Sequence, residues 1–322
     1  MTFPNANKFV GIYPNNRFGV LGVPETMLPD TTLPATPDAR VFYVNGGSDG
    51  PTNNNSDGMT PFTPKRTIAA ALALCVTGRN DIVVVLNYGG NARAVEVFPI
   101  ALTKDFVHIV GLGNPAQKWP VVSVLAPGGA DTARPAFLIT GNRCEISGLE
   151  IGGGNTAACV YIGAVGGAAP WGTWIHDNWF GVSTDSVGQD GVGILAGADA
   201  PMTRIENNEF GPSVTRDGIR IAGNSTRGMI VGNIFKRMAG IAINISGGAV
   251  NVSIQGNTMF LPSNTAGKGI TLAAATAGCY VSHNYANFGP TEMANNPYDD
   301  GAAGGVNDWV YNWKSITATM PA

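Results

Sequence analysis

The sequence is short of charge, and this shortage limits the partners that suit it. Charged residues make up 13% of its 322 residues, and the formal net charge is −3. Without a basic surface the chain cannot neutralise many phosphates, so we expect no nucleic-acid partner. Disorder needs high charge and little apolar content, whereas 44% of these residues are hydrophobic, so most of the chain should fold.

Other familiar signals are also missing. No apolar run approaches the roughly 18 residues that span a membrane, and the first residues show no basic region followed by an apolar core. We therefore expect no membrane partner and no secretory signal. The four cysteines form no Cys-x-x-Cys pair, and buried free thiols are a better interpretation than a disulfide framework. They are Cys75, Cys144, Cys159 and Cys279.

What the sequence has in plenty is glycine. Its 44 glycines follow no three-residue period, which excludes collagen. Glycine and asparagine between short apolar runs indicate an all-β protein with frequent turns.

The N-terminal part divides into two segments. Residues 1–40 carry six prolines and no sustained periodicity, which predicts an extended arm lying on its own body or on a partner. A partly disordered tail is the alternative. Residues 41–80 should hold a first strand, an Asx-rich loop and one helix at 64–77, which Thr63 caps and Gly78 ends. That helix is well placed to cover the first coil of a stack.

The loop contains a short sequence with a second interpretation. Asn53-x-Asn55-x-Asp57-Gly58 is faintly similar to a calcium loop, but its twelfth position is Pro64, where an EF-hand has glutamate. Asx turns explain the same residues without a cation. We therefore expect no metal site here.

An imperfect repeat beyond residue 140 decides the fold class. Its first element reads Ile-x-x-Asn-x-Phe in three copies, and two looser copies follow. Each copy contains one asparagine. The asparagines, spaced by 30, 25, 24 and 27 residues, are Asn178, Asn208, Asn233, Asn257 and Asn284. A second element has four positions: Gly first, Val or Ile second, any residue third, and Ile or Leu fourth. It occurs at 191–194, 218–221, 240–243 and 269–272.

Both elements alternate as strands do, and helix-free units of this size exclude ankyrin and tetratricopeptide repeats. A right-handed parallel β-helix, a solenoid, fits them best. Its coils would stack at about 4.8 Å, with small aliphatic residues inside. The asparagines would form a hydrogen-bonded ladder, and each would tolerate the left-handed bend between strands. We assign residues 81–290 to this β-helix and 291–322 to a C-terminal cap or interface segment.

Several segments of the chain resemble those of a known superfamily. Tyr43-Val-Asn45, Asp57-Gly58 and the Pro61-Phe62-x-Pro64 segment resemble the first segment of pectate-lyase-like right-handed parallel β-helix proteins. The two repeat elements are similar to those of their carbohydrate-binding and hydrolase relatives. The resemblance covers about residues 41–290 and implies the fold. It implies no single activity, because the superfamily includes lyases, hydrolases, epimerases and non-catalytic viral proteins.

A catalytic site would need two carboxyl groups about 5 to 9.5 Å apart. Asp190 and Asp217 each precede a copy of the second element, so stacking in register would place them about 5 Å apart. Arg220 would point outward nearby. Polar residues on a solvated face explain the same pattern. The paired aspartates, His-Gly step and Arg-x-Lys motif of polygalacturonase-like relatives do not appear in that arrangement.

Histidines and aromatic residues are further candidates for a functional site. His108, His176 and His283 are scattered and not clustered. His176 and His283 flank the asparagine ladder at different offsets, which indicates exposed turn residues rather than ligands, so we expect no metal and no cofactor. Two groups of aromatic residues could stack on sugars or anchor an interface. They are Trp171, Trp174 and Trp179, and then Trp309, Tyr311 and Trp313. For the C-terminal group an interface or an end cap is favoured.

Three functions remain open. The favoured hypothesis is a non-catalytic phage structural protein, a head decoration (cement) or a spike, that docks to capsid or tail proteins through residues 1–40 and displays the rod. It would be made in the host cytoplasm without a signal and form a homotrimer by analogy with other viral β-helices. The alternatives are a tailspike-like depolymerase, a polysaccharide hydrolase or lyase using Asp190 and Asp217, and a carbohydrate-binding module for host surface polysaccharide.

Overall fold

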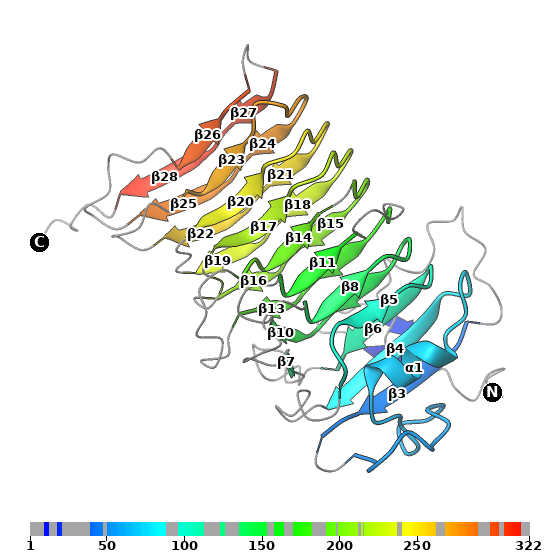
Figure 1. The fold of residues 1–322 in the computed structure, drawn as a ribbon. Coiled ribbons are helices and arrows are strands. Elements are labelled where there is room, and N and C mark those ends of the chain that lie inside the picture. The colour runs from blue at the N-terminus through cyan, green and yellow to red at the C-terminus, as the bar shows by residue number, and fades with distance from the viewer. Residues whose placement is uncertain are drawn as a thin grey trace, which may run out of the picture.

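The computed structural model describes most of the chain between residues 39 and 316, together with two short strands upstream. The described residues are 10–12, 18–20, 39–47, 50–87, 96–112, 123–125, 135–152, 158–163, 170–181, 191–197, 199–211, 214, 216–236, 240–261, 268–288, 297–302 and 306–316. They form an all-β, right-handed parallel β-helix, which confirms the fold predicted from the repeat (Figure 1).

Three parallel sheets run along the rod. Sheet I has ten strands, in spatial order β3 (Val41–Asn45), β4 (Asp81–Asn87), β6 (Val107–Gly111), β9 (Glu145–Ser147), β12 (Trp174–His176), β15 (Arg204–Glu206), β18 (Met229–Val231), β21 (Ser253–Gln255), β24 (Tyr280–Ser282) and β27 (Asp308–Val310). Sheet II has eight: β5 (Ile100–Leu102), β8 (Phe137–Ile139), β11 (Val160–Ile162), β14 (Ile194–Ala196), β17 (Asp217–Ile221), β20 (Ile241–Ile245), β23 (Ile270–Leu272) and β26 (Tyr298–Asp300).

Sheet III also has eight strands: β7 (Ser123–Leu125), β10 (Glu150–Gly152), β13 (Trp179–Phe180), β16 (Glu209–Phe210), β19 (Ile234–Lys236), β22 (Thr258–Leu261), β25 (Tyr285–Phe288) and β28 (Trp313–Ile316). Upstream of all three sheets, β1 (Val10–Ile12) pairs antiparallel with β2 (Phe18–Val20). The sheets run past residue 290, where the repeat had suggested that the β-helix ends, because β26, β27 and β28 add one more strand to each.

The interior of the rod is a continuous stack of apolar side chains. Each strand turns alternate residues inward, so equivalent residues of successive coils lie on top of one another. Phe180, Phe210 and Phe235 stack with ring centroids 4.9 and 4.7 Å apart. All four cysteines are free and buried, as predicted. Burial raises the pKa of the Cys75 and Cys144 thiols to about 12.

The repeated asparagines form a ladder along the turn between sheets I and III. Each side-chain oxygen accepts hydrogen bonds from the asparagine one coil earlier: Asn208 Oδ1 lies 3.1 Å from both the backbone nitrogen and Nδ2 of Asn178. Asn208 Nδ2 in turn donates to the Ile175 carbonyl at 2.9 Å. Asn312 forms a further rung that the repeat did not reveal.

The left-handed bend of this turn lies one residue earlier than the sequence suggested. The residue before each asparagine has the positive φ, as Asp177 does at 53° and Gly232 at 67°. The asparagines themselves are not among the positive-φ residues. Their conserved role within the repeat is therefore the side-chain hydrogen bonding and not the backbone conformation.

One helix, α1 (Ile68–Leu74), covers the first coil (Figure 1). It is shorter than predicted, and its N-cap is Thr67, not Thr63. The Thr67 hydroxyl accepts from the Ala70 N–H at 3.1 Å, whereas the Thr63 hydroxyl donates to Asp57 at 2.6 Å. Pattern alone could not decide between two threonines four residues apart. Among the described residues, no helix has the length and apolar character needed to cross a membrane.

The Asx-rich loop contains the Asx turns expected for it. The Asn53 side chain accepts from the Asn55 N–H at 2.9 Å, and Asp57 accepts from the Met59 N–H at 3.0 Å. The ammonium group of Lys65 donates to the carbonyls of Asn54, at 2.9 Å, and Ser56. The Lys65 side chain therefore ties this loop together through its main-chain carbonyls.

Candidate functional site

The candidate acids of the second repeat element lie at sheet II. Asp217 begins β17 and is 3% exposed. Its Oδ2 accepts a hydrogen bond from Asn244 Nδ2 on β20 at 3.2 Å, and Arg220 Nε lies 3.9 Å from the same oxygen. Asp190 lies outside the described residues. The structure therefore brings together Asp217 and Arg220 and adds Asn244, which sequence reasoning missed.

The register of sheet II differs from the one that the repeat suggested. Ile194 of β14 pairs with Ile219 of β17, two residues earlier than the alignment of the repeat's glycines predicts. Asp217 therefore lies level with Val192, so the register gives the neighbouring position to Val192 and not to Asp190. A slip of two residues keeps the same side chains facing inward, which is why the hydrophobic pattern could not detect it.

Close packing at two glycines fixes this register. A Cβ on Gly193 would lie 2.6 Å from the Gly218 carbonyl oxygen, and a Cβ on Gly218 would lie 2.5 Å from the Phe235 ring. Both distances are shorter than van der Waals contact. Only glycine allows the phenylalanine stack and the strands of sheet II to approach so closely.

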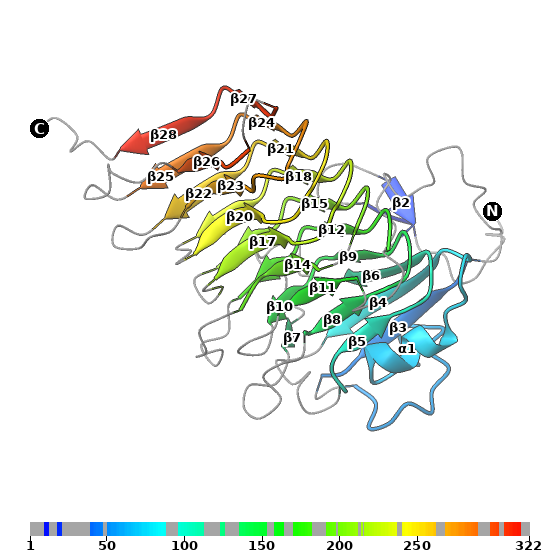
Figure 2. The ribbon, with the colours of Figure 1, turned by 45° about the horizontal axis from the view of Figure 1, so that its top comes forward.

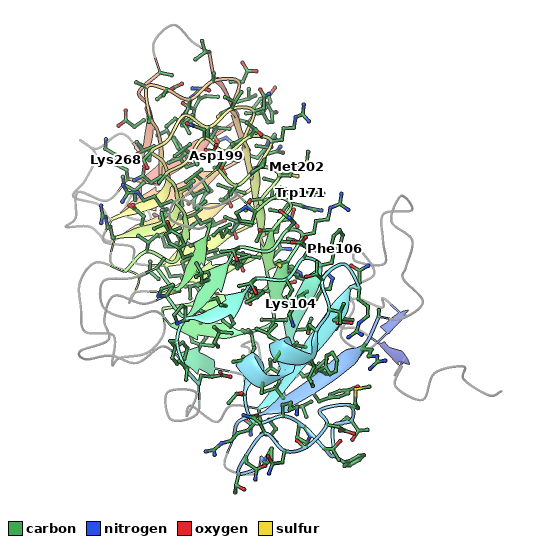
Figure 3. The ribbon with its side chains drawn as sticks, turned by 45° about the vertical axis from the view of Figure 1, so that its right-hand side comes forward. Lys104, Phe106, Trp171, Asp199, Met202 and Lys268 are labelled. Atoms are coloured by element: carbon green, nitrogen blue, oxygen red, sulfur yellow. The ribbon has the colours of Figure 1, made fainter. Side chains whose placement is uncertain are left out.

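A line of polar side chains, the polar strip, follows the outer face of sheet II. Successive strands place Arg220, Asn244, Thr271 and Asp299 at equivalent positions. Lys268 forms an ion pair with Asp299 at the end of this strip. Figure 3 shows Lys268 on the opposite edge of the rod from Trp171. The strip offers guanidinium, amide and carboxylate groups in one line, at the spacing of the strands, while the Thr271 hydroxyl oxygen is buried.

Carboxylates on the other two sheets also have partners. On sheet III, Glu209 forms an ion pair of 2.6 Å with Lys236 of the next coil. On sheet I, Glu206 pairs with Arg204 at 2.8 Å and accepts from the Trp174 indole N–H at 3.1 Å. These acids are held by hydrogen bonds and charge, so they stabilise the outer faces.

A charged cluster that the sequence did not reveal lies on sheet I. Glu145 of β9 is fully buried, with one oxygen 2.6 Å from His176 Nε2 and the other 3.0 Å from His108 Nδ1. His176 Nδ1 lies 2.7 Å from the Asp177 carboxylate. Both nitrogens of His176 face carboxylates, so both must donate, and the ring is an imidazolium.

The cluster shifts the ionisation of its members. Burial lowers the pKa of His176, but hydrogen bonds to Asp177 and Glu145 outweigh burial and raise it to about 9. Burial likewise raises the pKa of Glu145, and the hydrogen bonds from His108 and His176 outweigh it, so the pKa of Glu145 is lowered. The ion pair between Glu145 and His176 therefore persists across neutral pH.

The interpretation of the histidines as scattered turn residues is wrong for two of them. His108 and His176 lie on strands two coils apart with Glu145 between them, because β6, β9 and β12 are adjacent in sheet I. Aligning Ile109, Ile146 and Ile175 as one inward column would have shown this. His283 does lie in an exposed turn, with φ of 56°. No group of three or more ligand side chains suited to a metal occurs among the described residues.

The first aromatic group does not form an open platform. The Arg143 guanidinium lies 4.2 Å from the centre of the Trp171 ring, and that of Arg204 lies 5.0 Å from the Trp174 ring. Trp179 lies on β13 level with Glu209. All three tryptophans are partly buried. Arginine side chains therefore cover two of the faces on which a sugar would stack.

The C-terminal aromatic residues separate into two kinds. Trp309 turns inward, level with Val281 of the core, and its indole N–H donates to Asp300 at 2.8 Å. Tyr311 and Trp313 turn outward and are 67% and 54% exposed. Trp309 therefore covers the last coil, whereas Tyr311 and Trp313 leave an aromatic surface at that end of the rod.

Three solved structures are similar to this chain at low sequence identity. A mutant tailspike protein of E. coli bacteriophage HK620, in complex with a hexasaccharide, is 9% identical over 77% of this chain and 52% of that chain, with a TM-score of 0.39. A putative glycosyl hydrolase from Parabacteroides merdae is 10% identical over 73% and 82%, with a TM-score of 0.27. Pectate lyase Pel9A is 13% identical over 87% and 81%, with a TM-score of 0.30. The chain spans about half the length of the tailspike protein.

No curated protein matches the sequence. The family model described as the right handed beta helix region matches residues 134–286, which contain most of the repeat. The coils, the inward aliphatic columns and the asparagine ladder all fall within these residues or continue from them. Residues 134–286 therefore match the right handed beta helix region, and the sheet topology of the described residues agrees with that match.

Proposed function

We propose that this chain is a non-catalytic structural protein of a virus particle, a head decoration or a spike, whose β-helix serves as a rigid rod. The observation that carries the proposal is that four carboxylates on the outer faces of the sheets already have hydrogen-bond or ion-pair partners. Glu145, Glu206, Glu209 and Asp217 each have a cation, an amide or an indole as partner. Glycoside hydrolysis needs one acid that gives up a proton and a second that attacks or activates water.

The build of the rod supports a mechanical role. Three sheets share their hydrogen bonds with every neighbouring coil, and the asparagine ladder adds a further line of bonds along the same axis. Such a stack resists bending, because tilting one coil would stretch bonds on all sides. In this proposal residues 1–40 attach the rod to capsid or tail proteins, and three copies assemble together.

The test is retention on particles. Virions, or capsids assembled with their other proteins, would be prepared with the full chain and with a chain lacking residues 1–40. We expect the shortened chain to be lost from the particles while its circular dichroism still shows a folded rod. Asp217→Asn is the matched control, because it leaves residues 1–40 intact and should be retained. Full retention of the shortened chain would overturn the attachment.

The same variants test the catalytic alternative. We expect the full chain to release no oligosaccharide from host surface polysaccharide, and Asp217→Asn to behave identically. Cleavage by the full chain that Asp217→Asn abolishes would replace this proposal with a polysaccharide depolymerase.

A second function, saccharide binding without cleavage, is favoured by the polar strip alone. Amide, guanidinium and carboxylate groups in a line match the hydroxyls of an extended polysaccharide. The test is binding of host polysaccharide by isothermal titration with the chain and with Asn244→Ala. About a tenfold loss of affinity would support a saccharide site, whereas Ser253→Ala, on the outer face of sheet I, should change nothing. No binding by the full chain would remove this function.

A further inference from the structure

The outer face of sheet I is buried over its first strands and open over the rest. Outward side chains of successive strands lie in rows, because their inward neighbours fill the core columns. From β4 to β12 six of them are at most 7% exposed, namely Ile82, Val84, Val110, Glu145, Ser147 and His176. On β18 and β24 the equivalent residues Met229 and Tyr280 are 36% and 38% exposed. Ser282 on β24 is an exception among the later strands, because this small side chain is buried between Gln255 and Val310.

Two valines in the same row show that a covering layer causes the difference. Val84 and Val231 both point outward from sheet I, and each has a strand on either side. Val84 is fully buried, whereas Val231 is half-buried. Val84 and Val231 are the same size and both have strands on either side, so the greater burial of Val84 points to chain lying across the first strands.

The covered part is apolar at one end and charged at the other. Val41, Tyr43, Ile82, Val84 and Val110 form a hydrophobic cluster of their own, separate from the core of the rod. The charged cluster around Glu145 follows on the next strands. Leaving this apolar surface in water would be unfavourable in proportion to its area. Chain packed over this apolar cluster would therefore stabilise the N-terminal part of the rod.

We propose that the cover is the chain's own N-terminal arm, residues 1–38, packed across the outer face of β3, β4, β6, β9 and β12. The arm leads directly into β3, which is the edge strand of sheet I, so it reaches this face without crossing another sheet. Its hairpin of β1 and β2 lies on the outer side of sheet I near β6 (Figures 1 and 2). Its apolar islands, Val20 to Val23 and Met27-Leu28, match an apolar face.

The arm has ample length for this. Five strands at about 4.8 Å span about 19 Å, which an extended chain crosses in about six residues. The 38 residues can therefore run along the face and return as a hairpin. The inference goes beyond the particle role, and it changes what a partner meets, since an arm packed on its own rod presents a folded surface and not a free tail.

Cysteine labelling of the purified chain tests the proposal without any particle. Val84→Cys and its matched control Val231→Cys would each be placed in the full chain and in a chain lacking residues 1–38. We expect a maleimide to label Cys at 84 slowly in the full chain and about tenfold faster or more after the deletion. Labelling at 231 should be equal in both. A residue at 84 that stays protected after the deletion would mean that a connecting loop forms the cover.

A second variant guards against a shortened chain that fails to fold. Phe18→Asp with Val20→Asp keeps the full length but makes the hairpin polar, and it should raise labelling at 84 and leave 231 unchanged. Unchanged labelling at 84 in this folded variant would overturn the proposal. The proposal would also be overturned if diluting the full chain with Val84→Cys raised labelling at position 84. In that case the covering arm would come from a second copy of the chain. Either failure leaves the particle proposal standing.

Discussion

At the scale of single residues, the asparagine ladder makes the stability of the fold depend strongly on one polar side chain in each coil. Asn233 is fully buried, and its Oδ1 accepts from the backbone and the side-chain amide of Asn208, both at 3.0 Å. Its Nδ2 donates to the Ile205 carbonyl at 2.9 Å and to Asn257 at 3.0 Å. A buried group that loses its partner costs more than the bond itself contributed.

Asn233→Ala should therefore lower the free energy of unfolding by about 2 to 4 kcal/mol, because it leaves several buried donors and acceptors unpaired. Asn312→Ala, at the half-buried last rung, is the control and should cost about 1 kcal/mol. Urea denaturation of both variants measures the difference. Equal losses would mean that the ladder is no stronger in the middle than at its end.

The charged cluster on sheet I makes stability depend on pH. The pKa of His176, about 9 in the folded chain, lies above the ordinary 6.5, so protonation favours the fold. This contribution is fully present below pH 6.5 and is lost as the pH rises through 9. We expect the free energy of unfolding to fall by a few kcal/mol over that window, and His176→Gln to flatten the fall.

Two measurements check this. Urea midpoints from pH 6 to 9.5 give the slope in the two chains, and the carbon chemical shifts of the His176 ring give its pKa directly. A ring that titrates near 6.5 would show that Glu145 and Asp177 do not hold it charged.

At the scale of elements, the cap of α1 separates two neighbouring threonines. Thr67 accepts from the Ala70 N–H, so Thr67→Ala should cost about 1 kcal/mol of stability. Thr63→Ala removes an exposed bond to Asp57 in the loop and should cost less, about 0.5 kcal/mol or below. Thermal unfolding of the two variants gives the order. The reverse order would restore the longer helix that the sequence suggested.

The register of sheet II depends on Gly218. Gly218→Ala would place a methyl group 2.5 Å from the Phe235 ring and 2.7 Å from the Ala242 carbonyl, so we expect a loss of about 3 kcal/mol or more. Gly228→Ala is the control, since its nearest neighbour would be the Thr203 carbonyl at 3.4 Å, and it should be nearly neutral. Denaturant midpoints compare them, and a tolerated Gly218→Ala would mean that other contacts set the register.

The sequence predicts features that repeat in every coil, but it does not predict contacts that form only when the coils stack. Alternating Ile and Phe residues and a recurring asparagine predict the β-helix, because each coil repeats the same local requirement. The two-residue shift at Ile219 could not be seen, because it moves no side chain from inside to outside. The pairing of His176 with Glu145 was also missed, since it joins residues 31 apart that meet only when the coils stack.

At the scale of the whole molecule, the two ends of the rod differ. The first coil is covered by α1, and the last is covered by Trp309 and its hydrogen bond to Asp300. Beyond Trp309, an aromatic surface of Tyr311 and Trp313 remains exposed at the C-terminal end. Exposed aromatic residues gathered in one place are typical of protein interfaces. This surface is therefore where copies of the rod would meet if they form the proposed trimer.

Self-association should depend on that end alone. Tyr311→Ser with Trp313→Ser removes two aromatic side chains that are mostly in solvent, so the fold should survive while association weakens about tenfold or more. Phe62→Ser is the matched control, because Phe62 is 93% exposed near the opposite end of the rod. Sedimentation equilibrium of the three chains measures the association constants. A full chain that stays monomeric, or an equal loss in Phe62→Ser, would show that the aromatic end is not the contact between copies.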